Sequence, residues 1–179
     1  KSAANGGVMR TSVVGLIKDD IEVHAKDICR LTHPDTRCIG SSVIVSLIIH
    51  ELVYYNTELS YNDILCIVDK YDERIREYVT LAYEANDTDQ LVLEGLEQGY
   101  TLKTLAAALW AYWHCDSFEE GLLKIVNAGG DADTNAAVAC SMLGAKYGSN
   151  NIPKKYLSEL NNIDMLTDKI ELLYSFYKD

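Results

Sequence analysis

Apolar residues recur at intervals of three and four along most of the chain, as one face of an α-helix requires. Residues 36–55 carry such a series, and His33-Pro34-Asp35 before them is typical of a helix start, with Pro34 near the first turn. Residues 62–83 carry a second series, which Ser60 or Asn62 would cap. The apolar positions are Ile39, Val43, Ile44, Leu47 and Ile48 in the first series and Ile64, Leu65, Val68, Tyr71, Ile75, Tyr78 and Val79 in the second.

The second half of the chain continues this pattern. Ser117 and Glu120 have the spacing of a capping box, which predicts a helix start at residue 117. Residues 9–17 are apolar enough to resemble a strand, but no segment alternates convincingly between apolar and polar positions. We therefore predict an all-α bundle forming a single domain over residues 1–179. Helices are expected over residues 101–113, 117–127, 135–147 and 164–177, with a shorter helical stretch from residue 91 and a further turn opening at Pro153.

Composition narrows the range of partners. The 179 residues include 48% hydrophobic and 24% charged residues, the balance of an ordinary globular protein. Lys and Arg number 16 and Asp and Glu number 27, so the net charge is −11. This charge repels phosphate backbones and anionic lipids, and we expect neither a nucleic-acid nor a membrane partner. The longest apolar run, residues 43–49, is too short to span a bilayer.

Five scattered cysteines are present, and none of them forms a Cys-x-x-Cys pair. Neither a disulfide framework nor a zinc site is favoured by this arrangement. The simplest interpretation is a set of reduced thiols in the core of a cytoplasmic protein.

The most specific motif is Gly129-Gly130-Asp131-Ala132-Asp133-Thr134-Asn135. Asp131, Asp133 and Thr134 place three oxygen donors within one turn, and hard cations such as Mg²⁺ or Mn²⁺ take donors of this kind. The two glycines permit a positive-φ backbone that would turn both carboxylates toward one point. Three donors are too few for a hexacoordinate ion, so a metal site here would need a second cluster elsewhere.

Other interpretations of this motif are open or excluded by spacing. A Gly-Gly helix stop followed by Asp and Thr also suits the capping of the next helix without any metal. An EF-hand is excluded, because the required Asp, Gly and terminal Glu do not follow at that loop's spacing.

Two further segments carry candidate binding groups. In Asn5-Gly6-Gly7-Val8-Met9-Arg10, successive amides of a glycine-rich turn would form an anion nest, and Arg10 would add a charge-assisted bond. His33 lies beside Pro34 at a helix start and could bind a sugar hydroxyl or transfer a proton near neutral pH. A common structural turn and a buried or capping imidazole are the competing interpretations.

The remaining candidates are weaker. His33-Pro34-Asp35 also matches the signature of chaperone J-domains, but the basic helix that precedes it in those domains is absent from the flanking sequence. His114-Cys115 suggests a nucleophile pair, although adjacent residues seldom meet at a helix end. The 12 tyrosines and the helix bearing Trp110 and Trp113 are expected to serve packing rather than nucleotide stacking.

Taken in order, these motifs resemble the ADP-ribosylglycohydrolase family. The likeness rests on Asn-Gly-x-x-Met-Arg, then Thr-His-Pro-Asp, then Gly-Gly-Asp-x-Asp-Thr-Asn-x-Ala. The segments 117–120, 126–130 and 143–148 extend it, and it is weakest between residues 54 and 100. The resemblance implies a compact orthogonal helical bundle.

The family hydrolyses the bond that joins ADP-ribose to a protein side chain or small acceptor, in a cleft with two divalent metals, Mg²⁺ or Mn²⁺. Carried over by position, Asp131, Asp133 and Thr134 would be metal ligands, and His33 would contact a ribose. Asn5 and Gly6 would line the diphosphate or distal-ribose site. The substrate-binding residues implied by the resemblance are Asn5, Gly6, Gly7, Met9, Arg10 and His33.

The sequence also departs from the family pattern. The family's opening helix, with its assisting acidic residue, and its Thr-Asp-Asp segment find no match here. We therefore expect the chain to be the C-terminal part of such a domain. The missing N-terminal segment would be its partner and would contain the acidic catalytic residue. The alternative is a non-catalytic relative that binds ADP-ribose or has a structural role.

Overall fold

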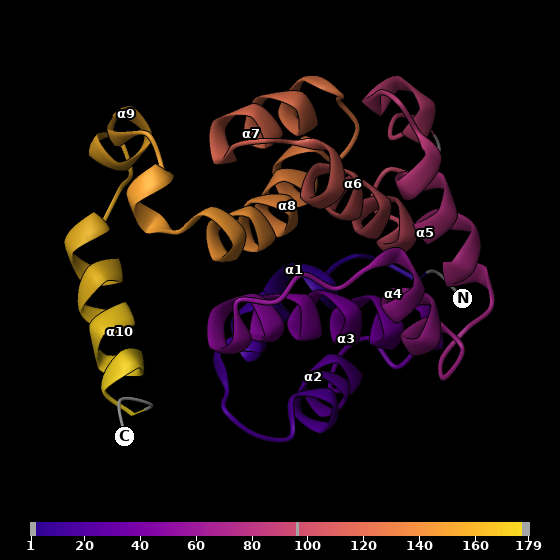
Figure 1. The fold of residues 1–179 in the computed structure, drawn as a ribbon, viewed down its shortest axis with the longest axis horizontal. Helices are drawn as coiled ribbons and strands as arrows, with labels where there is room; N and C mark the ends of the chain where they lie inside the picture. Colours follow the sequence, from indigo (N-terminus) through magenta and orange to yellow (C-terminus); the bar gives the residue numbers. More distant parts are fainter. Residues whose placement is uncertain (1–2, 96, 177–179) are drawn as a thin grey trace.

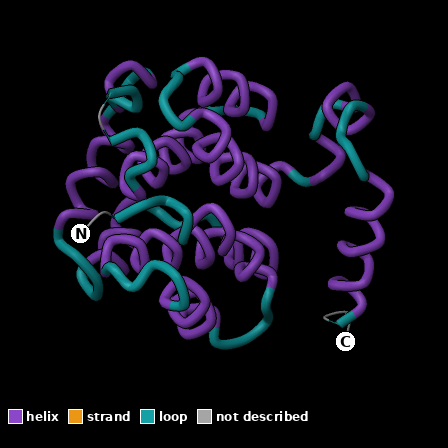
Figure 2. Tube along the Cα trace, turned by 180° about the vertical axis from the view of Figure 1, so that it is seen from behind, coloured by secondary structure: helices purple, strands orange, loops and turns teal. Residues whose placement is uncertain are grey.

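The computed structural model describes residues 3–95 and 97–176. In that part the chain folds into ten α-helices, and Figure 2 shows helices and loops without a strand there. The prediction of an all-α fold is confirmed. The α-helices are α1 (Val8–Thr11), α2 (Ile21–Arg30), α3 (Thr36–His50), α4 (Tyr61–Val68), α5 (Arg74–Glu84), α6 (Thr101–His114), α7 (Phe118–Asn127), α8 (Ala132–Tyr147), α9 (Lys154–Ser158) and α10 (Ile163–Ser175). The shorter turns are η1 (Ser12–Leu16), η2 (Glu51–Tyr55), η3 (Thr88–Leu91) and η4 (Ser149–Asn151).

Two helices from distant parts of the sequence form the centre of the bundle. Helix α6 packs against α5 and α8, and α3 packs against α2, α6 and α8 (Figure 1). Trp110 of α6 is 1% exposed, and its indole N–H donates to the carbonyl of Ala85 at 3.0 Å. Its predicted role in packing is therefore confirmed.

The helix predicted over residues 36–55 is present as α3 followed by the π-helical turn η2. Asp35 caps it through a hydrogen bond from the Arg37 amide, so Pro34 lies before the cap and not within the first turn. Together these 20 residues are long and apolar enough to cross a membrane, but 72% of the most apolar window is buried inside the fold. Burial in the bundle accounts for this apolarity without a bilayer.

The single helix predicted over residues 62–83 is wrong, because the chain breaks between α4 and α5. The Asp72 carboxylate accepts from the backbone N–H and the guanidinium of Arg74 and from the Thr36 hydroxyl. A local carboxylate that binds the amide two residues on competes with continuous helix. The predicted cap at Ser60 is confirmed, and Asp63 completes a capping box with it.

Several other boundaries differ from the prediction. Residues 92–95 and 97–100 contain no helix, so the stretch expected from residue 91 is only the end of η3. Residues 9–16 of the segment that resembled a strand are helical, in α1 and η1. Helix α8 begins at residue 132 rather than 135, which places Asp133 and Thr134 in its first turn. Helix α2 was not predicted, although Ile21, Ala25 and Cys29 are buried on one face at intervals of four.

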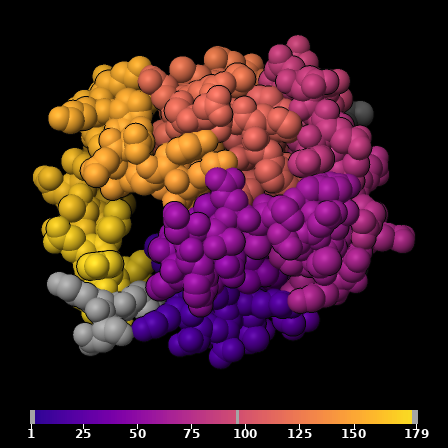
Figure 3. All heavy atoms as spheres, in the orientation of Figure 1, coloured from indigo at the N-terminus to yellow at the C-terminus, as the bar shows by residue number. Residues whose placement is uncertain are grey.

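The C-terminal helices α9 and α10 lie beside the bundle, and Figure 3 shows a hollow between them and its main body. Helix α10 matches the prediction over residues 164–177 to within two residues, with residue 177 outside the described part. Its apolar side chains are largely exposed, including Ile170 at 67%. A cavity of about 440 Å³ separates α10 from η1 and η2.

All five cysteines are free. Three are buried and Cys140 is half-buried, as expected for core thiols, but Cys66 is exposed and the expectation is wrong for that residue. The buried residues are Cys29, Cys38 and Cys115.

Candidate active site

The acidic motif forms the start of α8. Gly129 and Gly130 have φ values of +73° and +68°, which non-glycine residues rarely adopt. A Cβ on Gly130 would lie 2.5 Å from the carbonyl oxygen of Leu93, so the neighbouring backbone also excludes a side chain. The two glycines therefore turn the chain sharply from α7 into α8 beneath the segment that contains Leu93.

Asp131 occupies the N-cap position of α8, but its side chain makes no capping hydrogen bond. Instead, one carboxylate oxygen accepts from the side-chain amide of Asn5 at 2.6 Å, across 126 residues of sequence. The predicted N-cap position of Asp131 is thus confirmed, but a capping hydrogen bond does not account for its carboxylate. Its carboxylate is directed at the glycine-rich turn near the start of the chain.

Asn5 is held in place from several sides. It is 7% exposed, its backbone N–H donates to the carbonyl of Gly99 at 2.9 Å, and its side chain also donates to the Thr104 hydroxyl at 2.9 Å. Thr104 in turn donates to the side-chain oxygen of Asn135 at 2.8 Å. A buried polar network of this kind fixes the side chain that contacts Asp131.

Thr104 was not predicted as part of the site, because nothing in a threonine on an Ala- and Leu-rich helix indicates a polar partner. Asn135 was also not predicted, although its place within the acidic motif could have indicated that it belongs to the site. It is fully buried, and among the described residues its side-chain nitrogen has no hydrogen-bond partner.

The other two predicted metal ligands follow Asp131, which is half-buried. Asp133 is exposed and Thr134 is half-buried, both in the first turn of α8. Two carboxylates and a hydroxyl suit a hard divalent cation in kind. They are too few to complete the coordination shell of such a cation, because the described residues contain no group of three or more His, Cys, Asp or Glu that could hold a metal. The segment thus fits part of a metal site.

The glycine-rich turn and His33 lie together. A Cβ on Gly6 would lie 2.9 Å from the His33 ring and 3.3 Å from the guanidinium of Arg10. A Cβ on Gly7 would lie 2.9 Å from the Cys29 sulfur. Both glycines therefore allow a close approach of the α1 turn to the end of α2.

His33 and Arg10 already have local partners. The His33 Nδ1 atom lies 2.8 Å from the hydroxyl of Thr32, and the Arg10 Nε–H donates to the carbonyl of Gly6 at 2.5 Å. Arg10 is exposed, and it stabilises the turn that was expected to form the anion nest. Met9 is 46% exposed.

An ion pair not predicted from the sequence secures the start of α3 beside this site. Arg37 donates through Nε and one terminal nitrogen to the two carboxylate oxygens of Asp35, each at 2.8 Å. Its other terminal nitrogen donates to the Tyr100 hydroxyl at 3.2 Å. The hydrogen bonds from Arg37 lower the pKa of Asp35. The sequence signal was the Asp-x-Arg spacing at a helix start.

The His114-Cys115 pair is not a nucleophile site. His114 Nε2 lies within 3.1 Å of the carbonyl of Ala82, and Cys115 is buried. Burial raises the pKa of the Cys115 thiol to about 11, whereas a reactive cysteine requires a lowered value.

The helical bundle and the acidic turn agree with what a comparison with known protein families finds. A family model described as ADP-ribosylglycohydrolase matches residues 1–178, and the chain belongs to this family. Its fold is similar to that of a solved chain titled "ADP-ribosylglycohydrolase-related protein complex", with a TM-score of 0.76 and 28% identity over 97% of this chain and 60% of that one.

Individual relatives are similar over different shares of the chain. An uncharacterized protein of Archaeoglobus fulgidus is 31% identical over 96% of this chain and 58% of its own length. ADP-ribosylarginine hydrolase Tri1 of Serratia proteamaculans is 41% identical over 42% of this chain and 21% of its own. Human ADP-ribosylhydrolase ARH3 is 22% identical over 87% and 53%. The chain thus spans little more than half the length of the relatives that it matches throughout.

Proposed function

We propose that this chain takes part in hydrolysis of the glycosidic bond that links ADP-ribose to a protein side chain or small acceptor. One observation carries the proposal beyond family membership. The Asp131 carboxylate does not cap α8 but accepts a hydrogen bond from the buried Asn5 amide. The acidic turn and the glycine-rich turn therefore form one polar site. Relatives named as ADP-ribosylarginine hydrolase and ADP-ribosyl-[dinitrogen reductase] glycohydrolase support the same class of reaction.

The glycine-rich turn would bind the diphosphate. Gly6 and Gly7 carry no side chain, so a phosphate oxygen can approach their amides closely. His33, packed against Gly6, would donate or accept a hydrogen bond at a ribose hydroxyl. Arg10 would hold the turn in shape through its bond to the Gly6 carbonyl.

Asp131, Asp133 and Thr134 would hold Mg²⁺ or Mn²⁺, with two metal positions expected in the complete site. When bound, such an ion would orient the ribose hydroxyls and a water near the anomeric carbon. It would also offset the repulsion between a diphosphate and a protein of net charge −11. Asn5 would keep the Asp131 carboxylate oriented toward the ligand. In the overall reaction, water adds its oxygen to the anomeric carbon, and the acceptor leaves with a proton. We assign no general acid or base within this chain.

A second candidate function, non-catalytic binding of ADP-ribose, is favoured by the incomplete donor set. The described residues supply two carboxylates and a hydroxyl at the acidic turn, and no third His, Cys, Asp or Glu joins them. A chain with this partial shell would bind metal weakly and hold the ligand through the glycine-rich turn alone.

Calorimetric titration of the chain with ADP-ribose, with and without Mg²⁺, tests the proposal. We expect binding that Mg²⁺ strengthens, and Asp133→Asn should remove the strengthening. Asp164→Asn is the matched control, because Asp164 is likewise exposed in the first turn of a helix, α10. No binding in either condition would contradict both functions.

Hydrolysis separates the two functions. Release of ADP-ribose from an ADP-ribosylated arginine peptide should be measured with the product of the full reading frame that contains this chain. Mg²⁺-dependent release that is lost in Asp131→Ala supports the hydrolase. Binding without release supports the non-catalytic relative, and release unchanged in both Asp131→Ala and Asp133→Ala would exclude these residues from the reaction.

A further inference from the structure

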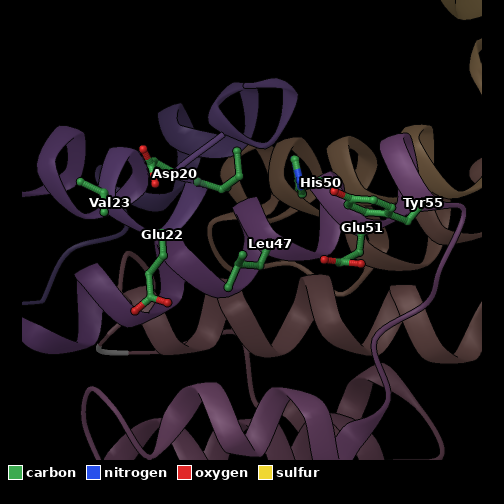
Figure 4. A pocket seen from close by; sticks show the side chains of 8 residues that line it. Asp20, Glu22, Val23, Leu47, His50, Glu51 and Tyr55 are labelled. Carbon is green, nitrogen blue, oxygen red and sulfur yellow. The ribbon is translucent and has the colours of Figure 1, made fainter. Parts of the chain in front are cut away.

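A second pocket lies at the opposite end of α3 from His33. It is a cavity of about 470 Å³ between the start of α2 and the end of α3 with η2. Figure 4 shows His50 and Tyr55 on one side of it and Asp20 and Val23 on the other, with Leu47 between them. Since α3 has 15 residues, its two ends are about 22 Å apart, which separates this pocket from the proposed ADP-ribose site.

The pocket contains a buried imidazole with an unused nitrogen. His50 is 7% exposed, and its Nδ1 atom has no hydrogen-bond partner among the described residues. The ring contacts the rings of Tyr54 and Tyr55, with centroid distances of 4.8 and 5.7 Å. A buried nitrogen without a partner costs free energy unless something binds to it. A π-helical turn, η2, begins directly after His50, and such turns frequently mark functional sites.

Three carboxylates line the pocket, and no Lys or Arg is among its described lining residues. Asp20 and Glu51 have no hydrogen bond or ion pair from their carboxylates within the described part of the chain. Asp20 has φ +54° directly before α2 and does not cap that helix. Glu22 accepts from the Tyr71 hydroxyl at 2.6 Å, which lowers its pKa and keeps it ionised, and Lys70 lies 3.4 Å away.

These groups together define the ligand chemistry. The carboxylates accept hydrogen bonds, the His50 Nδ1 atom is without a partner among the described residues, and the Tyr55 ring, whose residue is 64% exposed, offers an aromatic face. A guanidinium group is donor-only, planar and cationic, so it would bind a carboxylate through paired N–H groups and stack on the ring. A metal ion is disfavoured, because no group of three His, Cys, Asp or Glu among the described residues could hold one.

We propose that the pocket formed by Asp20, His50, Glu51 and Tyr55 binds an organic cation of the guanidinium class. Glu51 and Asp20 supply the charge, His50 Nδ1 accepts one N–H, and Tyr55 covers the plane of the cation. The proposal does not depend on the proposed function, because it uses none of the residues of the acidic or glycine-rich turns.

The test is an NMR titration of the ¹⁵N-labelled chain with two guanidinium probes. Agmatine represents a free small molecule, and the blocked tripeptide acetyl-Gly-Arg-Gly-amide represents an arginine side chain of a protein. The same tripeptide with citrulline, in which a neutral urea replaces the guanidinium, is the matched control ligand. We expect amide shifts at residues 20–23 and 50–55 with both guanidinium probes and none with citrulline. A response to agmatine alone identifies a small-molecule site, and a response to both identifies a site open to side chains.

Variants separate specific binding from general attraction to an acidic protein. Glu51→Gln should weaken agmatine binding roughly ten-fold or more, as expected for loss of a charge-assisted hydrogen bond. Glu84→Gln changes the net charge equally at an exposed position on α5 and should leave binding unchanged. Equal weakening in both variants, equal binding of the citrulline peptide, or the absence of shifts at these residues in the wild-type chain would overturn the proposal. The last two outcomes do not require any variant to fold.

Discussion

The Asn5 side chain gives the most informative perturbation of the candidate site. In Asn5→Ala the Asp131 carboxylate loses a hydrogen bond of 2.6 Å and the Thr104 hydroxyl loses one of 2.9 Å. A hydrogen bond to a charged group contributes about 1.5–3 kcal/mol and a neutral one about 0.5–1.5 kcal/mol. Because Asn5 is buried and Asp131 is half-buried, we expect Asn5→Ala to lower the free energy of unfolding by about 2–4 kcal/mol.

Asn5→Asp sharpens this prediction. The introduced carboxyl would lie beside Asp131 and repel it when both are ionised, so we expect a greater loss of stability than in Asn5→Ala at neutral pH. Repulsion raises the pKa of the introduced carboxyl in the folded state. The extra loss should therefore shrink as the pH falls through that raised pKa and vanish below the unfolded value of about 3.9. If the acidic turn holds a divalent cation, added Mg²⁺ should also reduce the loss.

Urea denaturation followed by circular dichroism measures these effects. Asn62→Ala is the control, since Asn62 is exposed and its replacement should change stability by no more than about 0.5 kcal/mol. An Asn5→Ala variant as stable as the wild-type chain would refute the reasoning. The reasoning would also be refuted if the difference in stability between Asn5→Asp and Asn5→Ala were the same at neutral and at acid pH.

Three further predictions concern the backbone, the pH dependence and the thiols. Gly130→Ala should destabilise the chain by about 2 kcal/mol or more, because φ is +68° and the Leu93 carbonyl blocks the new Cβ. Gly148→Ala, with φ +79° and open space around it, should cost only about 1 kcal/mol. Similar losses of stability in the two variants would contradict the steric argument. The hydrogen bonds from Arg37 lower the pKa of Asp35 in the folded state, so their contribution is complete above the unfolded value of about 3.9 and is lost as the pH falls through the folded pKa. Asp35→Asn should flatten this acid limb of the stability curve, and an unchanged limb would exclude the pair as its cause. Cys66 should react rapidly with a thiol reagent in the folded chain while the buried thiols react only on unfolding, and a fast phase that survives Cys66→Ser would contradict the structure.

Helical periodicity predicted much of the fold. The apolar series over residues 36–55 becomes a buried helix, because intervals of three and four fix one face of a helix. The Ala- and Leu-rich segment 101–113 becomes the other central helix. The break between α4 and α5 was missed, since it depends on Asp72 binding Thr36 and Arg74 rather than on a loss of apolar pattern. Helix α10 shows the limit of periodicity in another way, because a regular stripe there remains exposed.

The candidate site was predictable in its residue types but not in its connections. The Gly-Gly-Asp-x-Asp-Thr spacing indicated oxygen donors at a tight turn, and the glycines indeed have positive φ. The choice between capping and ligand binding for Asp131 could not be made from sequence. It depends on a hydrogen bond from Asn5 across 126 residues, and on Thr104 and Asn135, which hold Asn5 in place. Local spacing carries no information about such tertiary contacts.

The central claim is that the acidic turn of α8 helps to hold a divalent cation beside the glycine-rich turn. Electron paramagnetic resonance of Mn²⁺ measures this directly, since the signal of free Mn²⁺ falls as the ion binds. We predict that the wild-type chain and Asp164→Asn lower the free Mn²⁺ signal equally, that Mg²⁺ restores it by competition, and that the double variant Asp131→Asn, Asp133→Asn leaves it unchanged. Equal Mn²⁺ binding by the double variant and the wild-type chain would contradict the account.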